Sequence, residues 1–242
     1  GTVALVHDLG RPERFLNMLR VFKPTSPLSV GSYILAPFSS LAGAAAASNV
    51  TGVAPRLGRL AGAGAAVFGP PLATYTAALF SNTAIPVWHE AHRELPFVFG
   101  SSAAAAAGGT AMMLAPAAES GPAVRMAGVG AVAELGIGHV MEQRLGMLAE
   151  PYEKGLAGKL TKLSRALTVT GLGLSALGQR RPWLRRVAGA SYSAGSLALR
   201  FAVFEAGKES ARDPKYVVVP QRERIRAREE EARRQGSGTV SV

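Results

Sequence analysis

Two charged residues lie inside stretches of this chain that are long and apolar enough to cross a membrane. Glu134 lies within residues 122–141, and Arg200 lies within residues 183–206. A charge in hydrocarbon costs at least ~2.5–3.5 kcal/mol, so such a residue usually faces the interior of a helix bundle and marks a pathway or a binding site. The chain is therefore predicted to be an all-α, polytopic transmembrane helix bundle with a polar site between its helices.

The composition supports a membrane protein. Of the 242 residues, 48% are hydrophobic and 18% are charged, whereas charged residues make up about a quarter of a typical soluble protein. The chain has no cysteine, which excludes cysteine-ligated iron–sulfur clusters, thiol catalysis and disulfides within it. The net charge of +11 lies at helix ends and in the C-terminal tail. Membrane topology explains this placement better than nucleic acid, so we expect no nucleic-acid partner.

We predict six complete spans, separated by breaks at or near prolines. Gly1–Val6 reads as the last turns of a helix already under way, so we expect N-terminal residues of a further span before it. Residues 1–206 are predicted to form the bundle, and residues 207–242 a hydrophilic tail with a solvated helix or a partner contact at 220–235. The six spans are 28–48, 60–88, 95–116, 122–142, 160–179 and 183–206.

Six spans place four segments on one side of the membrane, which we call the motif face. They are the stretch before residue 28, the loop 89–94, the loop that follows residue 143, and the C-terminal tail. The motif face holds 19 of the 27 Lys and Arg residues, and the opposite face holds seven. The positive-inside rule then predicts that the motif face and the tail are cytoplasmic, in a multi-pass protein of the plasma membrane.

Several polar residues are predicted to lie at similar depths below the motif face. A helix rise of ~1.5 Å per residue puts Asn82, Glu134 and Arg200 roughly 9, 13 and 10 Å deep. Glu134 and Arg200 could also simply pair and hold the bundle together, and both interpretations stay open. The complete candidate set is Glu134 and His139 as catalytic proton carriers, with Tyr75, Asn82, His89, Glu90 and Arg200 as cofactor-binding residues.

The histidines do not predict a metal or haem site. A haem within the bundle commonly needs a His pair, and only His139 of the four histidines lies well inside a span. Residues 89–92 read His-Glu-Ala-His, which is one residue too short for the helical metal-binding pair His-Glu-x-x-His. Gly171-Leu-Gly173 lies inside an apolar helix and not after a strand, so a dinucleotide site is not expected. We therefore predict no metal, haem or iron–sulfur cluster in this chain.

Several longer motifs resemble the membrane subunit of the NrfD and polysulfide reductase family, with greatest similarity to its actinobacterial branch. The likeness covers about residues 2–225. It implies a protein of typically eight helices without cofactors of its own, which binds quinone beneath an iron–sulfur subunit that connects to a molybdopterin or related catalytic subunit. The motifs are 8–15 (Asp-Leu-Gly-Arg-Pro-Glu-Arg-Phe), 23–29, 79–82 with 86–90, 93–96, and 211–215 with 220–222.

The resemblance predicts a quinone-interacting membrane subunit that passes electrons between a ferredoxin-like 4Fe–4S partner and menaquinone or ubiquinone. Glu134 or His139 would carry protons, Asn82 or Arg200 would hydrogen-bond a quinone carbonyl, and His89 and Glu90 would border the entrance. One alternative is a secondary transporter or channel, which the buried charges would also fit, as would the second span, expected to kink or break at Gly69-Pro70-Pro71. The other alternative is a purely structural membrane anchor. The substrate of the catalytic partner stays open.

Overall fold

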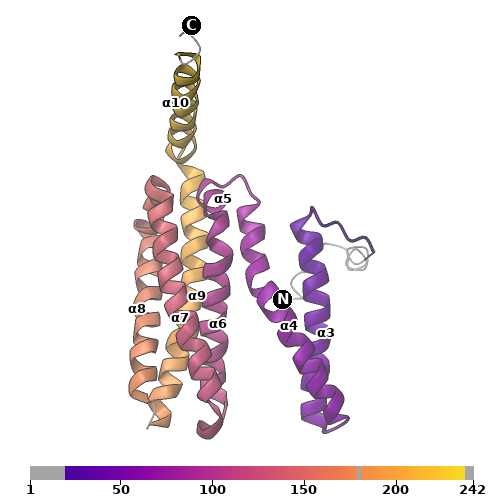
Figure 1. Ribbon diagram of the computed structural model, residues 1–242. Coiled ribbons are helices and arrows are strands. Elements are labelled where there is room, and N and C mark those ends of the chain that lie inside the picture. Colours follow the sequence, from indigo (N-terminus) through magenta and orange to yellow (C-terminus); the bar gives the residue numbers. More distant parts are fainter. Residues whose placement is uncertain (1–19, 179–180, 238–242) are drawn as a thin grey trace.

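The computed structural model describes residues 20–178 and 181–237, and every regular element in this part of the chain is helical (Figure 1). Six helices are long, and a seventh, α10, follows them as the C-terminal extension. The helices are α3 (Pro27–Thr51), α4 (Pro55–Ser81), α5 (Pro86–Glu90), η1 (Ala91–Arg93), α6 (Leu95–Leu114), η2 (Ala117–Glu119), α7 (Gly121–Leu145), η3 (Gly146–Tyr152), α8 (Gly155–Leu177), α9 (Pro182–Arg212) and α10 (Lys215–Ser237).

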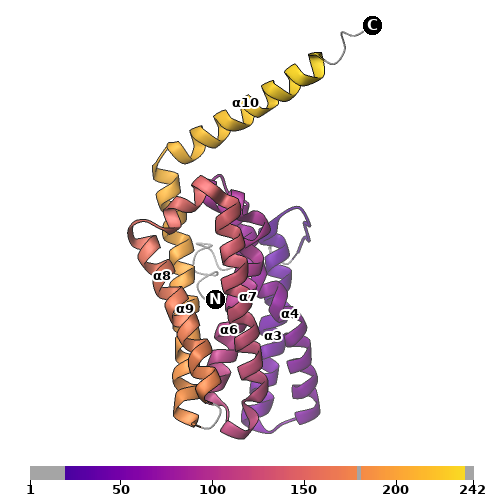
Figure 2. The ribbon, with the colours of Figure 1, turned by 60° about the vertical axis from the view of Figure 1, so that its left-hand side comes forward.

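Helices α6, α7, α8 and α9 form a bundle of antiparallel neighbours, and α3 and α4 form a hairpin beside it (Figure 1). The hairpin contacts the bundle mainly through α4 and α6. The segments α5, η1 and η3 lie at the end of the bundle from which α10 leaves, and α10 projects away from the other helices (Figure 2). The described segments predicted for the motif face thus do lie at one end of the molecule.

Three of the helices are long and apolar enough to cross a membrane. They are Pro27–Thr51, Leu95–Leu114 and Pro182–Arg212. The remaining long helices, α4, α7 and α8, have comparable lengths, but each contains more glycine than any of these three. The prediction of an all-helical protein is confirmed and three candidate spans are present, whereas the exact number of six spans stays a prediction. The expected N-terminal span and the motif at 8–15 lie outside the described residues.

The second predicted span, 60–88, is wrong at its C-terminal end. Helix α4 ends at Ser81, and a separate short helix, α5, begins at Pro86. Pro86 disfavours a helical conformation at the preceding residue, and Ile85 is accordingly extended, with φ −74° and ψ 119°. The helix is not interrupted at Pro70-Pro71, because α4 continues through both prolines. The Pro70 carbonyl accepts a hydrogen bond from the Thr74 hydroxyl at 3.1 Å.

Close packing of α6 against α7 depends on glycines on both helices. A Cβ atom on Gly130 would lie 2.6 Å from the backbone nitrogen of Ala105, and one on Gly108 would lie 2.6 Å from that of Ala127. Small residues of this kind let two helix backbones approach closely where no hydrophobic drive acts between helices in lipid. The α6–α7 pair therefore sets the position of the residues that follow Gly130 on α7, including Glu134.

The packing predicts that Gly130→Leu destabilises the protein strongly, whereas Gly128→Leu does not. A side chain at position 130 must push two backbones apart, and overpacking of this kind costs roughly 1–3 kcal/mol or more. Gly128 is the matched control on the same helix, because a Cβ there would meet no atom within 4 Å. The measurement is the thermal unfolding midpoint and the yield of monodisperse protein in detergent. Equal midpoints for the two variants would contradict this account of the α6–α7 contact.

Candidate functional site

Glu134 lies inside the four-helix bundle. Its side chain is on α7 and is 5% exposed. The Thr168 hydroxyl on α8 donates a hydrogen bond to its Oε1 at 3.1 Å, and its Oε2 has no hydrogen-bond partner. Glu134 also interacts with Ser102 on α6. A carboxyl group so placed is shielded from lipid by α6 and α8, as the cost of a charge in hydrocarbon requires.

Arg200 lies on α9 and points between α4 and α6. Its guanidinium carbon is 3.8 Å from the centroid of the Phe99 ring, and its Nη2 donates to the Phe99 carbonyl at 3.1 Å. Its Nη1 lies 3.5 Å from the Thr76 hydroxyl on α4. The cation–π contact and the hydrogen bonds offset the loss of water around a half-buried charge. Arg200 therefore links the hairpin to the bundle.

Glu134 and Arg200 do not form the direct ion pair that the sequence left open. Within the described residues no ion pair joins them, although each affects the other through the electrostatic field. One turn before Arg200, Ser196 accepts a hydrogen bond of 2.8 Å from Ser102, and Ser102 lies beside Glu134. A seam of polar groups thus connects α7 to α4 across α6 and α9. We call it the polar seam: Glu134, Ser102, Ser196, Arg200 and Thr76.

The other predicted residues do not join Glu134 and Arg200 in one pocket. Asn82 was expected 9 Å inside its span, but it is the exposed C-cap residue of α4, because that helix ends earlier than predicted. His139 is exposed on the outer face of α7, where its Nε2 lies 3.0 Å from Gln143 Nε2. His89 is also exposed, with Nδ1 3.2 Å from the Ser81 carbonyl oxygen.

Glu90 contributes to the attachment of α10. Its Oε1 accepts a hydrogen bond from Arg224 Nη2 at 2.5 Å, and two hollows of about 480 and 410 Å³ lie around this ion pair between α10 and the end of the bundle. Arg144, at the end of α7, pairs with Glu94 at 2.5 Å and also donates to the Glu90 carbonyl. Glu90 thus lies at the motif face, where it holds α10 against α5.

Tyr75 borders an apolar groove of about 350 Å³ between α3, α4 and the start of α6. Its ring packs against Gly31 so closely that a Cβ on this glycine would lie 2.0 Å from the ring. Tyr75 and Thr76 are consecutive on α4, so the helix presents the phenol to the groove and the threonine to Arg200. The groove is lined by Pro24, Thr25, Pro27, Val30, Ile34, Pro71, Thr74, Tyr75, Ala78 and Pro96.

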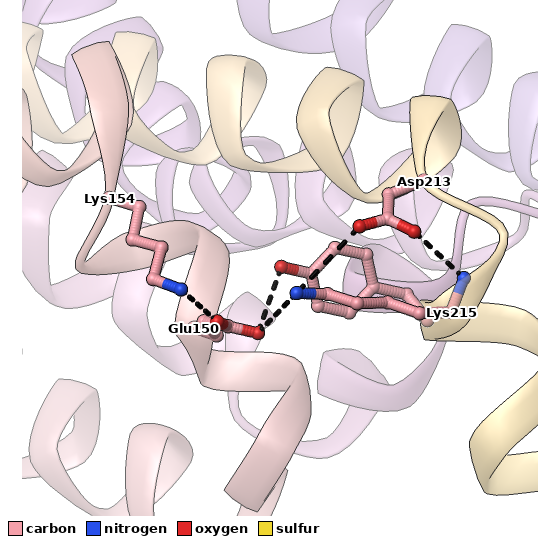
Figure 3. Close-up of polar contacts among 5 residues, drawn as sticks. Glu150, Lys154, Asp213 and Lys215 are labelled. Atoms are coloured by element: carbon pink, nitrogen blue, oxygen red, sulfur yellow. Dashed lines mark hydrogen bonds and ion pairs between the residues drawn. The ribbon is translucent and has the colours of Figure 1, made fainter.

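A cluster around Glu150 attaches the start of α10 to η3 (Figure 3). Glu150 Oε2 lies 2.8 Å from Lys215 Nζ and accepts a hydrogen bond of 3.1 Å from the Tyr216 hydroxyl, while Oε1 pairs with Lys154. Asp213 caps the turn by accepting the Lys215 backbone N–H at 2.9 Å. Hydrogen bonds from Lys154 and Lys215 lower the pKa of Glu150 to about 2.

This cluster predicts a pH-dependent attachment of α10. The pKa of Glu150 falls from 4.5 to about 2 in the folded protein, so the contact is present above pH 4.5 and is lost as the pH falls through about 2. Glu150→Gln should remove it at neutral pH and speed amide hydrogen exchange at the start of α10 several-fold. Glu153→Gln, in the same loop, is the control. Unchanged exchange at the start of α10 in Glu150→Gln would contradict the attachment.

The comparison with protein families gives one match, which covers residues 1–213 and is described as polysulfide reductase, NrfD type. The chain belongs to this NrfD family. Searches of curated proteins and of solved structures found no match. Members of the NrfD family are membrane subunits that associate with other oxidoreductase subunits.

Sequence reasoning missed the polar partners of Glu134. Ser102, Thr168 and Ser196 lie in helices rich in small residues, where a serine or threonine is typical of helix packing. Tyr152, whose buried hydroxyl has no hydrogen-bond partner, lies in the segment that was predicted to be a loop of the motif face. No signal in a single sequence separates these hydroxyls from the many other serines and threonines, because their role depends on which helix faces which.

Proposed function

We propose that this NrfD-family protein is the quinone-interacting membrane subunit of an oxidoreductase complex. It would exchange electrons between an iron–sulfur subunit on its motif face and menaquinone or ubiquinone in the bilayer. The observation that carries the proposal is the apolar groove bordered by Tyr75. The next residue on α4, Thr76, belongs to the polar seam, whose other end is Glu134. A membrane protein that handles quinone needs both an apolar slot and a protonatable group.

The groove fits the chemistry of a quinone headgroup. A quinone ring is flat and apolar with two carbonyl acceptors, and the walls here are mostly proline and aliphatic side chains, with the Tyr75 phenol as a donor. Bound quinone supplies the redox chemistry by taking up two electrons and two protons. The chain positions the ring, excludes water with α3 and α6, and holds protons at Glu134. Arg200 places a positive charge on the side of α4 that faces the bundle.

The partner contact is proposed at the end of the bundle that carries α10. Helix α10 is strongly polar, projects from the bundle (Figures 1 and 2), and is attached through Glu90 and Glu150. A ferredoxin-like 4Fe–4S subunit in this place would lie between α10 and α5, with the molybdopterin-type subunit beyond it. The excess of positive charge on the same face supports a cytoplasmic orientation in the plasma membrane.

Isolation of the native complex tests this function. Affinity purification in mild detergent should recover stoichiometric quinone on organic extraction and an iron–sulfur subunit by mass spectrometry. A photoreactive quinone analogue should label the groove around Tyr75, and cross-links from the partner should reach 89–94 and α10 in preference to 181–186 at the opposite end. Recovery of neither quinone nor a redox partner would favour a transporter or a structural anchor instead.

A further inference from the structure

A small, partly enclosed cavity lies between α7, α8, α9 and η3, on the side of the bundle away from the Tyr75 groove. Its volume is about 30 Å³. Glu134 and Tyr152 both line it, and they are 5% and 4% exposed. Among the described residues, Glu134 Oε2 and the Tyr152 hydroxyl are the buried side-chain atoms that lack a hydrogen-bond partner. Two segments far apart in the sequence therefore each contribute to the wall of one cavity a residue that carries an unpaired buried polar atom.

Such atoms need a partner inside a protein. A buried polar group without a hydrogen bond costs about 1–3 kcal/mol, and native proteins usually satisfy it with an internal water molecule. A water occupies about 30 Å³ in the liquid and needs two to four polar partners. The cavity has room for about one water, and the two unpaired atoms supply a donor and an acceptor.

The rest of the wall adds further partners for a water. The Thr161 hydroxyl donates to the Ala157 carbonyl at 2.9 Å, and the Ser164 hydroxyl donates to the Gly195 carbonyl at 2.8 Å. Since their hydrogens are used, both oxygens can still accept a hydrogen bond.

The cavity reaches the motif face through an ion pair. Glu142 and Arg165 also line it, and they pair with each other. Their side chains are 21% and 47% exposed, so this pair joins the interior to the aqueous side. Burial and the nearby Glu142 carboxylate raise the pKa of the Tyr152 phenol, which keeps its proton at neutral pH. Glu142 and Arg165 thus stand at the exposed end of the cavity, whereas Tyr152 and Glu134 are its buried members.

We propose that this cavity binds water and is the site through which protons pass between the motif face and Glu134, with the Tyr152 hydroxyl as the relay. The inference deepens the proposed function, because it rests on Glu134 as the proton carrier. In each transfer a proton from solvent at the Glu142–Arg165 end of the cavity binds the Tyr152 oxygen as the phenol proton passes to the bound water. One hydrogen of that water passes to the Glu134 carboxylate, so the net change is one proton moved inward. Transfer outward uses the same groups in reverse.

The test uses the purified complex and infrared difference spectra of its oxidised and reduced states. The carboxyl band of Glu134 is identified by its loss in Glu134→Gln, and its shift in deuterated buffer measures how fast solvent protons reach it. Tyr152→Phe, which removes only the hydroxyl, should slow this exchange roughly 10²-fold, the lower end of what a positioned proton-transfer group contributes. Gly138 lines the cavity, and a Cβ there would meet no atom within 4 Å, so Gly138→Val adds bulk at the cavity wall without displacing a neighbour and should slow the exchange similarly.

Tyr192→Phe is the control. This tyrosine is also buried, but its hydroxyl lies 3.1 Å from Ser175 Oγ, outside the cavity. The Glu134 carboxyl proton should exchange in this variant as fast as it does in the unaltered protein. Wild-type exchange in both Tyr152→Phe and Gly138→Val, or the absence of an exchangeable Glu134 band, would overturn the proposal. Slow quinone turnover in Glu134→Gln, together with normal exchange of the Glu134 proton in Tyr152→Phe, would reject this path and leave the proposed function standing. Full quinone turnover in Glu134→Gln would instead reject Glu134 as the proton carrier.

Discussion

Glu134→Gln should slow quinone turnover by roughly 10²–10⁴-fold, the range that a positioned proton-transfer group contributes. The amide keeps the shape of the side chain, and its oxygen can still accept the 3.1 Å hydrogen bond from Thr168. It removes only the capacity to bind and release a proton. The complex should therefore assemble normally and keep its bound quinone while the rate of reduction falls.

The measurement is steady-state turnover of a soluble quinone analogue by the purified complex, with subunit stoichiometry checked on the same sample. Glu119→Gln, in η2 at the opposite end of the bundle, is the control and should retain full activity. Full turnover by Glu134→Gln with an unchanged dependence on pH would show that the buried carboxyl only holds α7 and α8 together, and a structural anchor would then be the better description of this part of the protein.

Ala78→Phe should weaken quinone binding by roughly tenfold or more, because filling a formed site costs about 1–3 kcal/mol in steric overlap. Ala78 lines the groove and is exposed on α4, so a larger side chain there enters the groove without disturbing the buried core. The expected signature is a higher KM with a smaller change in kcat, which separates this variant from Glu134→Gln. Tyr75→Phe should show a weaker effect, since it removes one donor.

Ala66→Phe is the matched control, because Ala66 is likewise exposed on α4 but lies more than two turns nearer the start of that helix. Its KM should equal that of the unaltered protein, and photolabelling around Tyr75 should persist. An unchanged KM in Ala78→Phe with labelling elsewhere would move the quinone site away from this groove. This outcome would not bear on the membrane architecture or on the role of Glu134, which are tested by other measurements.

Comparison of the sequence with the structure shows which properties are local. The positions of the long helices followed from runs of apolar residues, because a helix satisfies its backbone hydrogen bonds within one segment. The error at residues 82–85 was also local, since Pro86 alone does not reveal whether a helix bends or ends. Glu134 and Arg200 were predicted to avoid lipid because the cost of exposing a charge to hydrocarbon depends on the residue and its depth.

The sequence by itself determined that this is an all-helical membrane protein with a charge inside two of its helices, because length and hydropathy are properties of one segment at a time. Only the tertiary structure decided what those charges meet. Arg200 stacks on Phe99, Glu134 bonds Thr168, and Tyr152 shares a cavity with Glu134. These contacts depend on the rotation and crossing of neighbouring helices, which close approaches such as that at Gly130 set. No single segment carries that information.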